Sequence, residues 1–197
     1  MCGISGLAGT EADPVLLERM AAAIRHRGPD DLGVLADADA GFGFRRLSII
    51  DVAGGHQPIF NEDESAAIIL NGEIYNHHDL RAGLVDRGHR FRTHSDVETV
   101  LHMWEEKRER CLEEMRGMFA LAIWSRRERS LFLARDRVGK KPLYYARLPK
   151  GGIVFGSEIK AILQHPEIKP EPDLAAIDEY LTTQYVPSPL TAFKGIE

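Results

Sequence analysis

The second residue of the chain is a cysteine, and Cys2 is the first candidate for chemistry. An initiator methionine is commonly removed when the next residue is small, and removal of Met1 would leave a thiol and a free α-amine on Cys2. The α-amine has a reference pKa of about 7.7 to 8.0, so it can act as a base near neutral pH without a large shift. One residue could then supply both nucleophile and base. Taken alone, however, a cysteine here is more often an incidental small residue of an N-terminal strand.

Other chemical signals are weaker. The basic stretch 135–141 could grip a phosphate but lacks Walker A spacing, and Gly41-x-Gly43 lacks the third glycine of a dinucleotide fingerprint. His77 and His78 are adjacent and so lack the spacing of a helix-borne metal pair. The other histidines form no recognisable ligand set, and the sequence predicts no metal site: His26, His56, His89, His94, His102 and His165.

Composition and charge argue against a disordered chain, a nucleic-acid-binding protein and a membrane protein. With 44% hydrophobic and 28% charged residues, the 197-residue chain has the composition of a globular domain, not of a disordered one. A net charge of -5 without a basic cluster argues against nucleic acid as a partner. No apolar run is long enough for a membrane span and no signal peptide is evident, so we expect a cytoplasmic protein without a membrane partner. Cys2 and Cys111 are expected to be free thiols, with Cys111 at the surface or half-buried.

The elements that must position Cys2 are predicted from periodicity. Strand-like stretches occur at residues 2–8, 33–36, 42–50, 66–70, 89–92, 119–124, 131–134, 143–146 and 153–156. Helical patterns occur at residues 13–28, 80–88, 95–104, 158–163 and 173–181. Asp13-Pro14 offers an N-cap and a first helical position, and Ser95 with Glu98 has the spacing of a capping box.

The order of these elements indicates the fold class. Strands follow strands, as in the hairpins 119–134 and 143–156, and helices interrupt them without the alternation of a parallel α/β sheet. The sequence therefore predicts an α+β fold with packed antiparallel sheets. Residues 165–172 carry three prolines and are interpreted as a linker into the last helix.

Seven short motifs occur in order along the chain, and together they are far more specific than any one of them. They are residues 1–4 (MCGI), 25–30 (RHRGPD), 46–51 (RLSIID), 71–76 (NGEIYN), 95–98 (SDVE), 135–145 (RDRVGKKPLYY) and 155–158 (FGSE). In these motifs the chain resembles the glutaminase domain of glutamine-hydrolysing asparagine synthetases, which are class II glutamine amidotransferases with the N-terminal nucleophile hydrolase fold. The resemblance implies a four-layer αββα sandwich, in which two antiparallel sheets lie between helices.

The resemblance also implies roles for individual residues. Cys2 would attack the side-chain amide of glutamine, and Asn71 with the N–H of Gly72 would form the oxyanion hole. Arg46 would bind the substrate α-carboxylate, because a guanidinium fork suits a carboxylate. Asp96 would pair with the α-ammonium, and it could equally cap a helix. Glu73 and the stretch Leu47, Ser48, Ile49 and Ile50 would complete the binding wall.

Asn71-Gly72 has a competing interpretation, because Asn-Gly is a strong hairpin signal and the pair alone would be taken for a turn. One departure from the family is Phe44, which stands where relatives often have histidine. It bears on the polarity of the pocket rather than on the nucleophile.

The resemblance predicts two parts. Residues 1–165 would form a glutamine amidotransferase type 2 domain, and residues 166–197 would be a linker and first helix leading to an absent synthetase domain. ATP and magnesium would be cofactors of that domain only, with none in this chain. Glutamine is the expected substrate, a synthetase domain in cis or in trans the expected partner, and a homodimer is possible in the family. The alternatives are an amidotransferase with another acceptor, as in peptide or polysaccharide modification, and a noncatalytic glutamine-binding module.

Overall fold

In the computed structural model, which describes residues 1–48 and 54–197, strand β1 (Gly3–Ala8) lies in the middle of a five-stranded antiparallel sheet. The order of strands is β2-β3-β1-β9-β8. The partners are β2 (Asp31–Ala36), β3 (Ala40–Arg46), β8 (Tyr144–Arg147) and β9 (Ile153–Gly156). The residues that follow the second position of the chain are thus hydrogen-bonded on both sides.

A second antiparallel sheet has the order β4-β5-β6-β7. Its strands are β4 (Ile59–Phe60), β5 (Ala66–Ile74), β6 (Gly117–Ser125) and β7 (Ser130–Arg135). Both hairpins expected from the sequence, β6–β7 and β8–β9, are present. The predicted strand material therefore forms two sheets.

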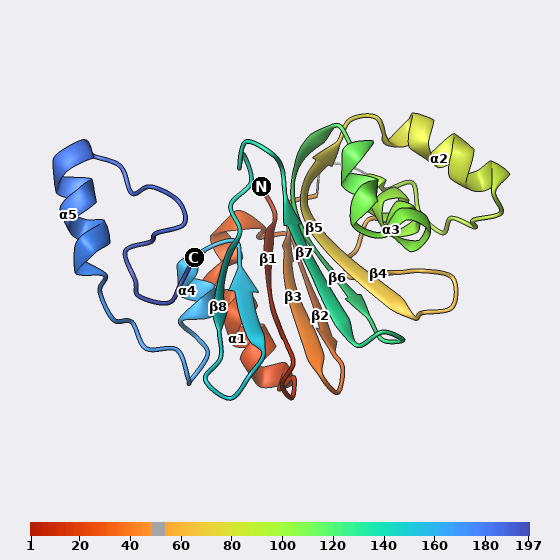
Figure 1. Cartoon of the computed structure of the whole chain (residues 1–197). Coiled ribbons are helices and arrows are strands. Elements are labelled where there is room, and N and C mark those ends of the chain that lie inside the picture. Colours follow the sequence, from red (N-terminus) through yellow and green to blue (C-terminus); the bar gives the residue numbers. More distant parts are fainter. Residues whose placement is uncertain (49–53) are drawn as a thin grey trace.

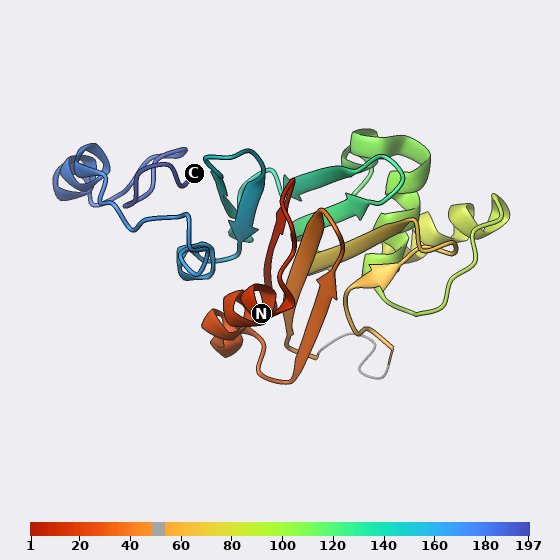
Figure 2. The same cartoon turned by 90° about the horizontal axis from the view of Figure 1, so that it is seen from below.

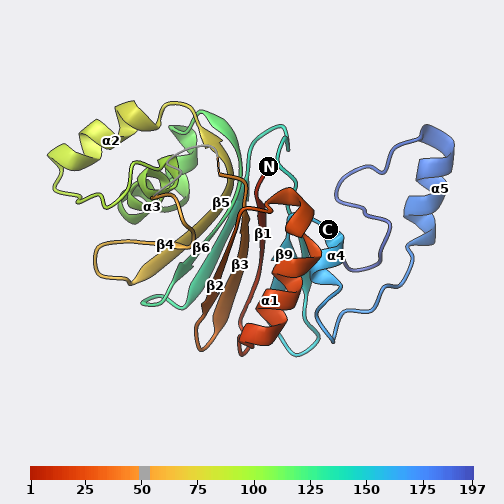
Figure 3. The same ribbon diagram turned by 180° about the vertical axis from the view of Figure 1, so that it is seen from behind.

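Helices cover the outer faces of both sheets, which confirms the α+β class and the four-layer αββα arrangement. Figures 1 and 3 show α1 and α4 on one side and α2 and α3 on the other. The helices are α1 (Pro14–Ala23), α2 (His77–Asp86), α3 (Asp96–Lys107), α4 (Ile159–Ile162) and α5 (Leu174–Thr183), with short 3-10 turns η1 (Arg25–Arg27) and η2 (Arg108–Glu113). Among the described residues, no helix has the length and apolar character needed to cross a membrane.

Apolar side chains fill all three interfaces between layers. One cluster lies between the sheets and includes Phe42, Phe44 and Phe155; the others lie beneath α1 with α4 and beneath α2 with α3. Phe44 therefore has a packing role here. Cys111 belongs to the cluster beneath α3 and is fully buried, so the expectation of a surface or half-buried thiol is wrong.

The helix starts confirm most of the capping pattern. Asp13 Oδ1 accepts from the Val15 N–H at 2.9 Å with Pro14 in the first turn, and Ser95 Oγ accepts from the Val97 N–H at 3.2 Å. The reciprocal half of the predicted capping box is wrong. Glu98 does not turn back to Ser95, because its carboxylate accepts hydrogen bonds from the loop that precedes the helix.

The predicted strand 89–92 is also wrong, because that segment is a loop. Three of its N–H groups have partners other than a neighbouring strand: the His89 N–H donates to the Leu84 carbonyl at 3.1 Å, the Arg90 N–H to Glu62 Oε1 at 3.0 Å and the Arg92 N–H to Glu98 Oε1 at 2.7 Å. A helix carbonyl and two carboxylates thus satisfy backbone donors that a sheet would otherwise satisfy.

The C-terminal segment leaves the sandwich and returns to it. Helix α5 stands apart from both sheets in Figures 1 and 2, and most of its residues are exposed. The chain then comes back to the edge of the first sheet, where Tyr145 and Glu197 exchange two backbone hydrogen bonds of 2.9 and 3.0 Å. Ile196 is buried beside the core under α1 and α4.

Candidate active site

A cavity of about 190 Å³ opens beside Cys2, between the ends of strands from both sheets and the start of α3. It brings together most of the side chains singled out in the sequence. The lining includes Cys2, Arg46, Leu47, Asn71, Gly72, Glu73 and Asp96. Ser48 does not line it, and its N–H donates to Asp30 Oδ2 at 2.9 Å. Ile49 and Ile50 lie outside the described residues.

The half-buried Cys2 is held at both its thiol and its backbone. The Leu47 N–H donates to Cys2 Sγ at 3.4 Å, and Sγ lies 3.6 Å from the Leu47 carbonyl. Arg27 Nε donates to the Cys2 carbonyl at 3.0 Å. The thiol is therefore fixed beside the cavity by strand β3, which ends one residue before Leu47, and Met1 lines the same cavity.

Residues of two family motifs, 25–30 and 155–158, stabilise the N-terminal end of β1. The sequence alone assigned neither motif a role. Arg27 Nη1 donates to Glu158 Oε1 at 3.0 Å, and Ser157 exchanges hydrogen bonds of 2.8 and 3.0 Å with the backbone of Ile4. Burial disfavours the Glu158 carboxylate, but hydrogen bonds from Arg27 and Lys160 outweigh it and lower its pKa. An ionised Glu158 thus orients Arg27 toward Cys2.

Asn71 and Gly72 lie inside strand β5, so the interpretation of this pair as a turn is wrong. Asn71 pairs with Ala120 and Gly72 with Phe119 of β6. Asn71 is 1% exposed, and its Nδ2 finds no hydrogen-bond partner in the described part of the chain. A buried donor without a partner costs stability, so such a group calls for a functional explanation.

Gly72 is required by the close approach of β6. A Cβ built at this position would lie 2.1 Å from the Met118 carbonyl oxygen and 2.7 Å from Phe119 Cα. Both are backbone atoms of the paired strand, so neither can move aside alone.

We therefore expect Gly72→Ala to lower the free energy of unfolding by about 2–4 kcal/mol, because the added methyl group forces the two strands apart. Urea denaturation followed by circular dichroism measures the loss. Gly83→Ala in α2 is the matched control: its new Cβ meets only the end of the Arg87 side chain, and alanine should stabilise the helix by about 0.5 kcal/mol. Equal midpoints for both variants would contradict the strand-spacing argument.

Two buried charges of opposite sign face the cavity from different elements. Arg46 ends β3 and is 6% exposed, whereas Asp96 begins α3 and is 3% exposed. Asp96 Oδ2 also accepts the Ile74 N–H of β5 at 2.8 Å. The helix start and the end of β5 are therefore joined by the same carboxylate. Such a pair of fixed charges suits a zwitterion.

Gln57 and Lys141 are among the lining residues that sequence reasoning missed. Gln57 is buried, and its side-chain amide makes two hydrogen bonds to the backbone of Leu70, of 2.7 and 3.2 Å, directly before Asn71. Lys141 is 6% exposed and lines the cavity from the segment that precedes β8. Lys141 stands in the basic stretch dismissed as a phosphate loop, and no local pattern distinguishes it from Lys140.

Comparison with known proteins identifies the family of the chain. A family model described as a glutamine amidotransferase domain matches residues 1–197. The glutamine-hydrolysing asparagine synthetase 2 of Bacillus subtilis strain 168 is 44% identical over 84% of this chain and 23% of its own length. The glutamine-hydrolysing asparagine synthetase 3 of the same organism is 40% identical over 100% of this chain and 33% of its own length. The chain thus spans a third or less of these curated relatives.

Among solved structures, the chain resembles a glutamine phosphoribosylpyrophosphate amidotransferase from B. subtilis in complex with ADP and GMP. The TM-score is 0.68 and the identity 20%, over 82% of this chain and 43% of that one. At this identity the likeness establishes the fold alone, that of the N-terminal nucleophile amidotransferases.

Proposed function

Because the chain belongs to the glutamine amidotransferase domain family, we propose that it hydrolyses glutamine to glutamate and ammonia with Cys2 as nucleophile. The observation that carries this proposal is the buried Asn71 amide, whose Nδ2 has no partner among the described residues and which lines the cavity of the Cys2 thiol. A preorganised donor beside a nucleophile is what acyl transfer requires, since negative charge develops on the carbonyl oxygen.

The proposed reaction proceeds through a thioester. Cys2 Sγ attacks the side-chain amide carbon of glutamine, and its proton passes to the α-amine freed by removal of Met1. Asn71 Nδ2 and the Gly72 N–H stabilise the oxyanion of the tetrahedral intermediate. Its collapse breaks the carbon–nitrogen bond, and the α-ammonium returns the proton to the departing ammonia. Water then cleaves the thioester, releasing glutamate and the thiol.

The ends of the amino acid are assigned to the two buried charges. Arg46 binds the α-carboxylate and Asp96 the α-ammonium, with Glu73 and Leu47 beside them in the wall. Ser48, Ile49 and Ile50 stay predicted members of that wall. With both charged groups held, only the side chain of the substrate extends to Cys2.

The role of Asp96 gives a prediction. Asp96→Asn keeps an oxygen that can accept the Ile74 N–H but removes the charge, so kcat/KM for glutamine should fall about 10- to 100-fold, mainly through KM. Glutaramate, which is glutamine without its α-ammonium group, should be hydrolysed equally by both proteins. Initial rates of ammonia release give the ratio of kcat/KM between the two proteins on each substrate. An equal loss on glutamine and on glutaramate would contradict the pairing of Asp96 with the α-ammonium.

The direct test of the function is the release of ammonia and glutamate from glutamine. The protein should be untagged, with removal of Met1 verified by mass. We expect equal amounts of both products and no release from asparagine. A folded, trimmed protein that binds glutamine without turning it over would instead support a noncatalytic binding module.

We further propose that the ammonia serves ATP-dependent asparagine synthesis from aspartate. Two facts support this proposal: the relatives are named asparagine synthetases, and this chain spans a third or less of their length. A synthetase domain, in cis or in trans, would use the ammonia. ATP and magnesium would belong to that domain. Residues 1–165 are proposed as the amidotransferase domain, and residues 166–197 as a linker and first helix leading to a synthetase domain. A homodimer and a reducing cytoplasmic location, which suits a free thiol nucleophile, belong to the same proposal.

A further inference from the structure

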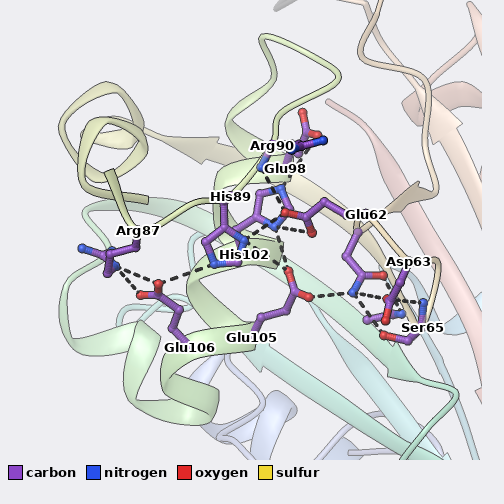
Figure 4. A network of polar contacts seen from close by, with 12 residues as sticks. Glu62, Asp63, Ser65, Arg87, His89, Arg90, Glu98, His102, Glu105 and Glu106 are labelled. Carbon is purple, nitrogen blue, oxygen red and sulfur yellow. Dashed lines mark hydrogen bonds and ion pairs between the residues drawn. The ribbon is translucent and has the colours of Figure 1, made fainter. Parts of the chain in front are cut away.

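Four potential metal ligands meet beneath the loop before α3, although the sequence suggested no ligand set. Glu62 comes from the turn between β4 and β5, His89 from the loop after α2, and His102 and Glu105 from α3 (Figure 4). Each offers one atom, and these atoms all lie within 4.8 Å of one another. None of the four lines the cavity beside Cys2.

The spacing of the four groups suits a small cation. His102 Nδ1 lies 2.7 Å from Glu105 Oε2 and 3.5 Å from Glu62 Oε2, while His89 Nδ1 lies 3.1 Å from Glu62 Oε1 and 4.0 Å from Glu105 Oε2. Ligand atoms of a tetrahedral zinc site lie about 3.4 Å apart, given bonds of about 2.0–2.1 Å. His102 approaches Oε2 of Glu62 and His89 approaches Oε1, so a shared ion requires the Glu62 carboxylate to turn one oxygen toward both rings.

Both histidines also carry the outer partner that metal-bound imidazoles usually have. His102 Nε2 faces Glu98 Oε1 at 3.9 Å, and His89 Nε2 faces Glu106 Oε1 at 3.5 Å. Glu106 is itself held by Arg87 Nε at 2.7 and 2.8 Å. A ligating histidine commonly directs its second ring nitrogen to a carboxylate, which fixes the tautomer and the ring orientation. Here each ring points Nδ1 into the cluster and Nε2 at a glutamate of α3.

The second ring nitrogen of His102 also bears on the state of the cluster. Its side chain is 0% exposed, and its Nε2 has no hydrogen-bond partner within the described ranges. In a neutral ring that donates from Nδ1 to Glu105, Nε2 would present a lone pair to the Glu98 carboxylate. A metal ion on Nδ1 would place the proton on Nε2, facing Glu98. A second proton on the ring would do the same: burial lowers the pKa of His102, but the carboxylates of Glu105 and Glu98 raise it to about 9. Metal binding and protonation are thus the two states that direct an N–H from Nε2 to Glu98, and titration with Zn²⁺ distinguishes them.

We propose that Glu62, His89, His102 and Glu105 bind one divalent transition-metal ion, with zinc as the best match. Two imidazoles favour zinc and its neighbours over magnesium or calcium, which prefer all-oxygen shells. Four protein ligands from three segments make a closed site, as in structural rather than catalytic zinc centres.

The site would stabilise the start of α3. Glu98 accepts hydrogen bonds from the Arg92 N–H, the Thr93 N–H and the Thr93 hydroxyl, at 2.6–2.7 Å. The loop joined by these bonds leads directly to Asp96. An ion that holds His89 and His102 therefore ties that loop to α3 and to the β4–β5 turn.

Isothermal titration of chelator-stripped protein with Zn²⁺ tests the proposal, in a Cys2→Ala background so that the thiol at the cavity cannot bind the ion. We expect one Zn²⁺ per chain, a rise in Tm of several degrees, and no saturable binding of Mg²⁺ or Ca²⁺. Co²⁺ should give the visible absorption of a four-coordinate site with nitrogen and oxygen ligands. None of these readouts depends on glutamine hydrolysis.

Glu62→Gln and Glu64→Gln form the matched pair, because Glu64 lies two residues away, is 62% exposed at its side chain and stands outside the cluster. Glu62→Gln should weaken Zn²⁺ binding at least tenfold, and Glu64→Gln should leave it unchanged. His102→Gln should abolish Zn²⁺ binding. If that variant does not fold, the comparison of Glu62→Gln with Glu64→Gln decides the test. Absence of saturable binding, or equal affinities in the pair, would overturn the proposal and leave a protonated His102 as the centre of the network.

Discussion

Cys2→Ala is expected to abolish glutamine hydrolysis, with a loss of kcat on the order of 10⁴-fold or more, because the nucleophile of the proposed thioester is removed. The fold should survive, since the Cys2 side chain is only half-buried beside the cavity. Ammonia release and circular dichroism, measured on the same preparation, separate loss of chemistry from loss of structure.

The control is the second thiol. Cys111 is fully buried, and this burial raises its pKa to about 11, so it should neither react with iodoacetamide nor contribute to turnover. Cys111→Ala should lower stability by about 1–2 kcal/mol while keeping kcat. Alkylation of trimmed protein should add one group, at Cys2, in step with the loss of activity. Turnover that persists in Cys2→Ala, or in a chain that retains Met1, would refute the mechanism.

Asn71→Ala is expected to lower kcat by about 10²–10³-fold with little change in KM, because the amide acts on the oxyanion rather than on the bound substrate. Its effect on Tm should be small. The Nδ2 of Asn71 makes no hydrogen bond with the described residues, so truncation removes an unsatisfied buried donor together with its packing.

Asn61→Ala is the matched substitution with the opposite expectation. Asn61 is 3% exposed, and its Nδ2 donates to Asp63, Ser65 and Glu105. Its removal should cost stability and spare kcat. Steady-state kinetics and thermal unfolding of both variants test the contrast. An Asn71→Ala protein that loses stability but keeps its rate would show that the amide is structural.

The sequence correctly predicted those helices and strands whose formation depends on residues close together in the chain. The Asp13-Pro14 start of α1, the Ser95 cap of α3 and the β6–β7 hairpin all depend on residues within a few positions of one another. The four-layer arrangement followed from the family motifs, and the two sheets with their helices confirm it.

Patterns failed where distant residues decide the conformation. Asn71-Gly72 has the chemistry of a turn, yet pairing with β6 over nine residues keeps β5 extended through both. The segment 89–92 alternates like a strand, but Glu62 and Glu98 take its backbone donors.

The candidate site shows the same division. The motifs identified seven residues that line the cavity, whereas Gln57 and Lys141 were missed because only the tertiary fold brings them there. No spacing rule connects His89, in a loop, with Glu62 on another hairpin, and the cluster around His102 was missed for the same reason.

The position of β1 in the middle of its sheet has a consequence for biosynthesis. Its partner β9 and the Ser157 that bonds to Ile4 are made about 150 residues later, which takes roughly 8–30 s at ordinary rates of translation. Until then the first strand lacks one neighbour and the chain end remains open to an aminopeptidase. Once β9 is in place, Cys2 is held at the edge of the cavity by Arg27 and Leu47. For the proposed mechanism, removal of Met1 would therefore come before completion of the sheet, and the α-amine of Cys2 would be free before the cavity beside it is fully formed.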